Sequence, residues 1–547
     1  MSEYDFVIVG AGSAGCVLAA RLSEDPGTRV LLLEAGPPDK RTEIQIPAAF
    51  GKLFHTEVDW DYKTAPEPGM GGREMFWPRG KTLGGSSSTN AMIYMRGHPA
   101  DYDGWEKLGN EGWSWQDVLP YFKRSENNQR GADEYHGAGG PLDVSDLRYV
   151  HPVTRAVIEA GVQDFGWPEN HDFNGASQDG IGINQVTQRN GRRWSAASAF
   201  LKPALKRPNL TVITEALAQR VVLEDGRAVG VEFSTNGSAA RVGRAGREVI
   251  LSAGAVNSPQ LLMLSGIGPA AHLKATGIEV KADLPGVGQD LQDHLAVGVQ
   301  WTLTTPISLL NAGSKRSLVD FLLRGRGMLA SNVAEGNGFL RTDPALPAPD
   351  LQLVFAPVIY DPEAEAAGIV PEHGFAIGAI LLQPQSRGEI QLASNRPGDP
   401  PSIRPRYLTD SEGKDIAVLI EGAKLCRRLG EGKALDPYRK EEVLPGPQVR
   451  TDAEIEAAIR ERAATLYHPT SSCRMGSDRM AVVDDQLRVH GVAGLRVADA
   501  SVMPRVPRGN TNAPTIMIGE KAADLVRGRV PASQSVESAV QGHQAAL

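Results

Sequence analysis

Four residues near the N-terminus have the types and spacing of a phosphate-binding turn. Gly10, Gly12 and Gly15 follow the apolar run 5–9, and Glu34 ends a second apolar run 19 residues after Gly15. The first glycine permits a tight turn, the second lets the backbone approach a pyrophosphate, and the third lets helix and strand pack closely. The helix N-terminus binds the phosphates, and the acid binds a ribose hydroxyl. The pattern predicts an adenine dinucleotide without showing which one.

Three further segments carry polar side chains, and each has a second, plainer interpretation. Residues 80–97 are dense in glycine and hydroxyl groups, which is typical of a loop that wraps a polar ligand and equally typical of a turn-rich connector. His468 stands in a loop of small polar residues, where a histidine is more often structural than catalytic. Asn510 and Asn512 precede a helical segment, where asparagine is a common helix cap.

Alternating strand and helix patterns must position these residues. Residues 1–36 read as strand, helix and strand, and residues 248–264 as a further strand, a small-residue turn and a helix. Strands are also expected at 211–214 and 229–233, whereas 41–85 reads as a long ordered excursion. The strand at 495–499 and the helix at 513–526 return the C-terminal segment to the same sheet.

The composition changes between residues 296 and 465. Alternating runs at 351–355 and 388–392 predict an antiparallel sheet, and helical periodicity marks 415–429 and 452–465. The sequence therefore predicts an α/β Rossmann-like dinucleotide domain and an α+β substrate domain with an antiparallel sheet. The dinucleotide domain is expected to be discontinuous, comprising 1–155, 195–297 and 464–530. The substrate domain takes 156–194 and 298–463, and 531–547 is expected to be a disordered tail.

Size and charge restrict the function classes. The 547-residue chain carries a formal net charge of −8, which offers no basic face for nucleic acid. We expect no signal peptide, and no apolar run is long enough to span a bilayer, so peripheral membrane contact is the membrane association left open. The cysteines Cys16, Cys426 and Cys473 suggest neither disulfides nor a zinc site. We expect no metal and a cytoplasmic location, with a peripheral position at the inner membrane as the alternative.

Taken together, the motifs resemble the glucose–methanol–choline (GMC) oxidoreductases. The resemblance rests on the turn with Glu34, the block 84–97, the block 254–268, the element 290–294 and the ending with His468 and Asn512. It covers about residues 4–527 and is nearest to bacterial alcohol dehydrogenases, followed by choline dehydrogenases. It implies a GMC fold and FAD as the cofactor.

The resemblance also implies roles for individual residues. His468 is expected to accept the hydroxyl proton of an alcohol, and Asn512 to donate to the developing alkoxide. Asn510 is expected to contact the flavin or cap the following helix. The expected cofactor-binding residues are Gly10, Gly12, Ser13, Ala14, Gly15, Glu34, Ala35, Gly84, Ser86, Asn90, Ala91, Met92, Ile93, Ala218, Asp499, Ala500, Asn510 and Pro514.

The residue aligned with the histidine that holds FAD covalently in some choline oxidases is Thr89, so non-covalent FAD is expected. The resemblance implies oxidation of a primary alcohol to an aldehyde, hydride transfer to flavin N5, and a quinone-type electron acceptor. Choline dehydrogenase and oxygen-using alcohol oxidase are the alternatives; hydroxynitrile lyase and fatty acid photodecarboxylase rank lower. A nicotinamide-dependent dehydrogenase is disfavoured, and the oligomeric state is left open.

The substrate wall is expected within 300–465, including Asn332, Glu335, Phe339 and the loop 355–360. Glu335 could pair with a cationic substrate such as choline. An exposed surface carboxylate is the favoured interpretation, because exposed glutamate is the norm.

Overall fold

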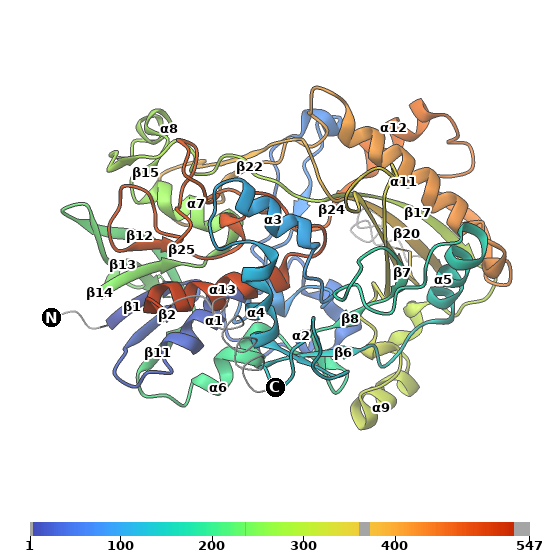
Figure 1. The fold of residues 1–547 in the computed structure, drawn as a ribbon, viewed down its shortest axis with the longest axis horizontal. Helices are drawn as coiled ribbons and strands as arrows, with labels where there is room; N and C mark the ends of the chain where they lie inside the picture. The colour runs from blue at the N-terminus through green and yellow to red at the C-terminus, as the bar shows by residue number, and fades with distance from the viewer. Residues whose placement is uncertain (1–3, 236, 360–371, 530–547) are drawn as a thin grey trace, which may run out of the picture.

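The protein consists of two parts, each built on its own sheet, that lie side by side along the long axis (Figure 1). The computed structural model describes residues 4–235, 237–359 and 372–529. Each part has its own apolar core, one under each sheet. The predicted disordered tail and Tyr360 lie outside the described residues.

The first sheet has the strand order β11-β2-β1-β14-β13-β12. Its parallel centre consists of β1 (Tyr4–Val9), β2 (Val30–Leu33), β11 (Leu210–Ile213) and the second half of β14 (Arg241–Leu251). Every residue of β2 is buried, because helices cover both faces of a parallel sheet. The hairpin of β12 (Ala216–Glu224) and β13 (Arg227–Thr235) extends the sheet along the more exposed first half of β14.

The C-terminal segment returns to this first sheet. β25 (Leu495–Val497) pairs in parallel with β14, and α13 (Asn512–Arg527) packs against α1 (Ser13–Leu22). Asp499 follows β25, and its carboxylate accepts from Gly254 N (2.9 Å) and Ser258 Oγ (2.5 Å) at the start of α7 (Gly254–Leu264). The two ends of the chain therefore meet at the first sheet, where β1 and β25 both pair with β14 and α1 packs on α13.

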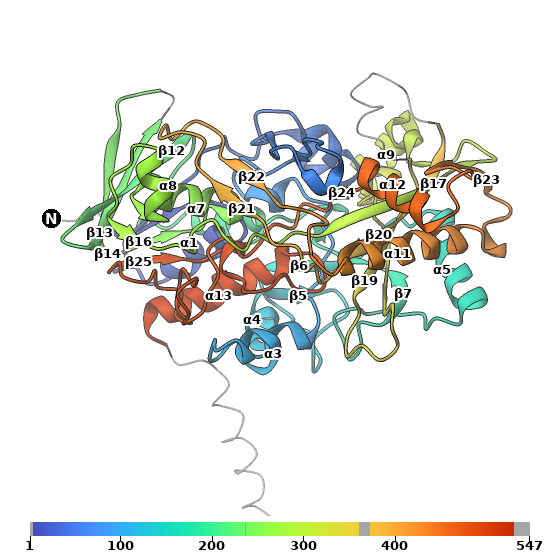
Figure 2. The ribbon, with the colours of Figure 1, turned by 90° about the horizontal axis from the view of Figure 1, so that it is seen from above.

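The second sheet is antiparallel and has the order β23-β17-β20-β19-β18-β7. Its strands are β7 (Gly180–Ile183), β17 (Leu295–Leu303), β18 (Gly336–Leu340), β19 (Leu351–Ala356), β20 (Gly374–Leu381) and β23 (Arg439–Leu444). The helix α11 (Lys414–Gly430) packs on β17 and β20, and α5 (Pro152–Phe165) lies near β7 (Figure 2). The predicted fold class is confirmed, while the exact domain boundaries stay a prediction.

Two predicted elements differ from the structure. Residues 388–392 do not join the main sheet, because β21 (Glu389–Gln391) pairs with β22 (Ser402–Arg404) as a separate hairpin. The helix predicted over 452–465 ends earlier: α12 is Asp452–Arg462, and Ala464–Thr465 forms β24, which pairs with β17. In the described part of the chain, no helix is long and apolar enough to cross a membrane.

Candidate active site

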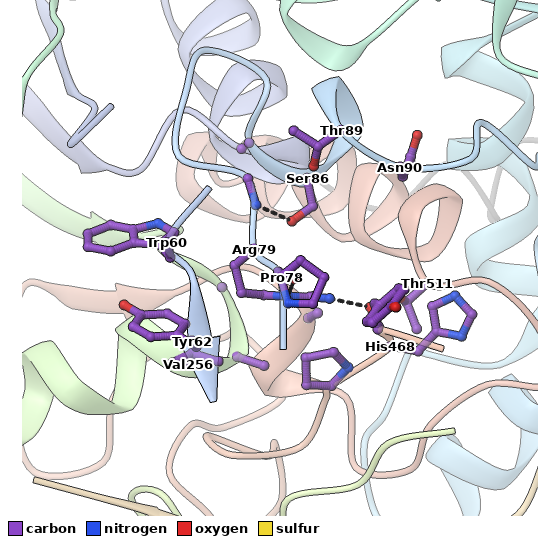
Figure 3. Close-up of a pocket in the computed structure, with 18 of the residues that line it drawn as sticks. Trp60, Tyr62, Pro78, Arg79, Ser86, Thr89, Asn90, Val256, His468 and Thr511 are labelled. Carbon is purple, nitrogen blue, oxygen red and sulfur yellow. Dashed lines mark hydrogen bonds between the residues drawn. The ribbon is translucent and has the colours of Figure 1, made fainter. Parts of the chain in front are cut away.

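One cavity of about 650 Å³ takes its lining from both parts of the molecule. The lining includes the glycine turn after β1, residues from β17, β19 and β20, and the segment around His468. In Figure 3, Trp60 and Tyr62 lie on one side of this cavity and Asn90 and Thr89 on another, with Arg79 between them. Most of the exposed lining area is apolar.

The three glycines of the turn have different physical constraints. Gly10 has φ +95°, and a Cβ there would meet Ser252 O at 2.5 Å. A Cβ on Gly15 would lie 1.8 Å from Gly10 O, so Gly15 is required for close packing of α1 on β1. A Cβ on Gly12 would meet only Ser252 O at 4.0 Å, so space is open beside this glycine. That open backbone at a helix N-terminus fits a pyrophosphate.

Glu34 is held rigidly at the end of β2. Its carboxylate accepts from Ala11 N and Gly36 N, both at 2.8 Å. Burial raises the pKa of Glu34 to about 7, and the backbone hydrogen bonds oppose this rise. The side chain lines the cavity, where its remaining lone pairs can accept from a ribose hydroxyl.

Asp293 fixes the loop that carries His468. Its Oδ1 accepts from His468 N at 2.7 Å, and its Oδ2 accepts from Thr465 Oγ1 at 2.5 Å and from the Tyr407 hydroxyl. Tyr467, directly before the histidine, has φ +66°, a conformation that bulky residues adopt only when their surroundings enforce it. The sequence element 290–294 therefore orients the histidine loop.

The hydrogen bonds around His468 define which ring nitrogen faces the cavity. His294 Nε2 lies 3.2 Å from Leu382 O, which can only accept, so this nitrogen carries the proton. Neutral His294 then has a lone pair on Nδ1, which lies 2.9 Å from His468 Nδ1. His468 must donate from Nδ1, and its Nε2 is left with the lone pair. These proton positions follow from the network.

Burial and nearby groups keep both imidazoles neutral. Burial lowers the pKa of His294 to about 4. The pKa of His468 also lies well below its ordinary value, because burial and the Arg79 cation disfavour imidazolium. A neutral imidazole with its lone pair on Nε2 can accept a proton from a bound hydroxyl.

Asn510, rather than Asn512, faces His468. Asn510 Nδ2 lies 3.1 Å from His468 Nε2, and its Oδ1 is buried without a partner among the described residues. Asn512 Oδ1 instead accepts from Ser13 Oγ at 2.7 Å, at the start of α1. Asn512, the expected helper of His468, therefore does not bond this histidine, because it begins α13 and its side chain is bonded to Ser13 beside the glycine turn; its expected role as a donor to the alkoxide stays a prediction. Both asparagines line the cavity.

Most of the expected cofactor-binding residues line this cavity, including Glu34, Asn90 and Ala218. Three do not: Gly15 packs against Gly10, Gly84 forms a turn at φ +90°, and Pro514 is buried within α13. The open space at Gly12 and the unpartnered Asn510 Oδ1 are features that a bound FAD would use. The described residues therefore fit this cofactor, and their individual roles remain proposals.

Two important side chains were not predicted from the sequence. Arg79 lines the cavity and donates from Nη2 to Tyr467 O at 2.7 Å (Figure 3). His294 contacts His468 from a position 174 residues earlier. The aromatic and proline-rich segment 41–85 was the sequence signal that could have indicated Arg79. The Asp-His pair at 293–294 was the signal that could have indicated His294.

Glu335 is not the exposed carboxylate that the sequence favoured. It has 0% exposure, and it accepts from His151 N (2.8 Å), Thr154 Oγ1 (2.6 Å) and Ser331 Oγ (2.6 Å). Its carboxylate accepts hydrogen bonds at the N-terminus of α5 and does not line the cavity. Neither Asn332 nor Phe339 lines it.

A dinucleotide-binding sheet, an antiparallel partner and a neutral imidazole between them indicate a dinucleotide-dependent oxidoreductase. The model of the GMC oxidoreductase family matches residues 4–296 with its N-terminal part and 384–519 with its C-terminal part. The chain therefore belongs to the GMC oxidoreductases, and FAD is its cofactor.

Individual relatives are similar over nearly the full chain. "Alcohol dehydrogenase [acceptor]" of Pseudomonas putida is 46% identical over 96% of both chains. "Oxygen-dependent choline dehydrogenase" of Brucella ovis is 47% identical over 97% of both chains. Among solved structures, pyridoxine 4-oxidase from Mesorbium loti has a TM-score of 0.87 and 34% identity, covering 96% of this chain and 100% of its own.

Proposed function

We propose that this protein oxidises an uncharged primary alcohol to an aldehyde, with His468 as the base. The observation that carries the proposal is the hydrogen-bond chain from Leu382 O through His294 to His468. This chain presents the lone pair of His468 Nε2 to the cavity. When bound, FAD supplies the acceptor for the hydride that leaves the carbinol carbon.

The chain's own side chains would handle the proton. His468 Nε2 takes the hydroxyl proton, and the imidazolium formed keeps its Nδ1–H bond to His294. The Asn510 amide donates to the substrate oxygen as negative charge develops there. Because the lone pair now points at Asn510 Nδ2, an entering hydroxyl must displace this contact.

The cavity wall supports an uncharged substrate. The strands β17, β19 and β20 and the loop after β19 give this wall small or apolar residues and one amide, Gln300; the others are Ala296, Val297, Gly298, Val354, Ala356, Val358, Ala376 and Gly378. Alternate residues of β19 face the cavity, and Phe355 between them is buried in the second core. Among the described residues of these strands and this loop, no carboxylate lines the cavity, which favours aliphatic alcohols over choline; the carboxylates elsewhere in the lining are Glu34, Asp399 and Asp499.

We further propose non-covalent FAD and a quinone-type acceptor. The name of the Pseudomonas putida relative supports an acceptor other than oxygen, whereas the name of the Brucella relative points to oxygen. Hydrogen peroxide release at the rate of alcohol turnover would exclude the proposed acceptor. Turnover with a soluble quinone and without peroxide would support it.

Replacement of His468 tests the proposal directly. We expect His468→Gln to retain FAD and to slow anaerobic flavin reduction by an aliphatic alcohol about 10²-fold or more, because a general base is lost. The matched control is His171→Gln, because the His171 side chain is 79% exposed and does not line the cavity. Unchanged flavin reduction in His468→Gln would refute the proposed base.

A further inference from the structure

The helix α9 (Lys315–Arg324) exposes most of its apolar side chains. Leu318, Val319, Leu322 and Leu323 are 44%, 53%, 58% and 80% exposed. Ten large hydrophobic residues are exposed in the described part of the chain, and five of them lie between Leu310 and Leu323. Scattered exposed leucines are ordinary, but a contiguous apolar group marks an interaction surface.

The exposed face of α9 is part of a stable helix. Residues 318 and 322 lie one helical turn apart, and so do residues 319 and 323, so all four share one face of the helix. On the opposite side Phe321 is buried beneath the Arg192 guanidinium, 5.0 Å from its ring centroid. Ser314 Oγ accepts from Ser317 N at the start of the helix, and Gly325 ends it with φ +58°. Figure 1 shows α9 at the edge of the molecule.

Basic residues surround this apolar face. Lys315, Arg316, Arg324 and Arg326 are exposed, and the one acid within 315–326, Asp320, pairs with Arg324 at 3.2 Å. This local positive charge contrasts with the −8 of the whole chain. Exposed leucines with flanking lysine and arginine are the chemistry that binds an anionic lipid surface.

The charges argue against a second copy as the partner. A symmetric dimer contact would bring the same patch from both subunits together, and the four basic residues of each would face like charges. Lipid phosphates would instead complement them. The short helix η6 (Met328–Ala330) packs against both α9 and η1 (Pro47–Leu53), and Phe50 of η1 lines the cavity. The surface is therefore connected to the cavity wall.

We propose that α9 and Leu310 form a membrane-contact surface that binds anionic lipid bilayers. The leucines enter the interfacial region and the basic side chains contact the headgroup phosphates. The inference does not depend on the alcohol substrate or on His468.

Co-sedimentation of the FAD-loaded full chain with phosphatidylcholine vesicles, with and without phosphatidylglycerol, tests this surface. We expect binding to the anionic vesicles that weakens with salt and at least about 10-fold weaker binding to neutral vesicles. Leu318→Ser, Leu322→Ser and Leu323→Ser combined should lower binding at least about 10-fold. The matched control is Leu108→Ser with Leu205→Ser, because these leucines are 45% and 48% exposed elsewhere.

Unchanged FAD content and far-UV circular dichroism would show that each variant is folded. Equal binding by the α9 variant, or no binding of the parent protein to anionic vesicles, would overturn the proposal. A parent dimer that the α9 substitutions convert to a monomer would overturn it in favour of a second copy. The rate of flavin reduction should be unchanged, which separates this test from that of His468.

Discussion

His468 is fixed on both ring nitrogens, and each contact has a different consequence. His294 lies 2.9 Å from Nδ1 and determines the tautomer, whereas Asn510 lies 3.1 Å from Nε2 at the cavity. Loss of the first contact should change the protonation behaviour of the ring. Loss of the second should remove a donor to the reacting oxygen.

Replacing Asn510 and Asn512 separately compares their effects on the rate of flavin reduction. We expect Asn510→Ala to slow anaerobic flavin reduction by about 10²-fold, the usual effect of removing one donor to a developing oxyanion. Asn512→Ala should change this rate only a few-fold, because its side chain is bonded to Ser13. Stopped-flow spectrophotometry measures both rates. A slower reaction in Asn512→Ala than in Asn510→Ala would contradict the assignment.

Replacement of His294 should shift the pH dependence of kcat/KM. His468 must be neutral to accept a proton, so kcat/KM falls as pH drops through its lowered pKa. Neutral His294 accepts from His468 Nδ1–H and so stabilises the imidazolium; His294→Leu removes this acceptor and should shift the acid limb of kcat/KM to lower pH. His294→Asn should restore the parent profile in part, since an amide can both accept from His468 and donate to Leu382 O. A uniform loss of activity without a shift would indicate a purely structural role.

The sequence predicted His468 as the base and Asn512 as its helper, whereas the structure brings Asn510 to His468. Both asparagines lie at or just before the start of α13 and line the cavity, but Asn510 is directed to His468 and Asn512 to Ser13. Contacts such as His294 to His468 span 174 residues and depend on β17 and the histidine loop meeting in space. The burial of Glu335 likewise depends on α5, which reaches it from residues 151–154.

At the scale of elements, local patterns predicted the first sheet better than the second. Near-continuous apolar runs such as β2 are buried on both faces, and the glycine turn fixes how β1 leads into α1. The run 388–392 alternates as expected, yet alternation does not specify a partner strand, and it pairs locally with β22.

Because α1 packs closely on β1, one added methyl group at Gly15 should strongly affect stability and FAD binding. Gly15→Ala should lower stability by about 1–3 kcal/mol or more and reduce FAD content, because the new Cβ would lie 1.8 Å from Gly10 O. Gly104→Ala is the matched control: a Cβ there meets nothing within 4 Å in the middle of α3 (Pro99–Lys107). Thermal unfolding and bound-flavin absorbance measure both. Equal melting temperatures in the two variants would contradict the packing argument.

At the scale of the whole molecule, the cavity draws on both sheets, so FAD should stabilise the two parts together. Thr89 lines the cavity at the position expected for a covalent histidine and cannot form that bond. Acid precipitation should therefore release yellow FAD into the supernatant. The apoprotein should melt at a lower temperature than the holoprotein, and added FAD should restore the difference in a concentration-dependent way, because a ligand that binds only the native state stabilises it by mass action. A yellow pellet would demonstrate covalent attachment, and an FAD-independent melting temperature would show that the cofactor does not connect the two parts.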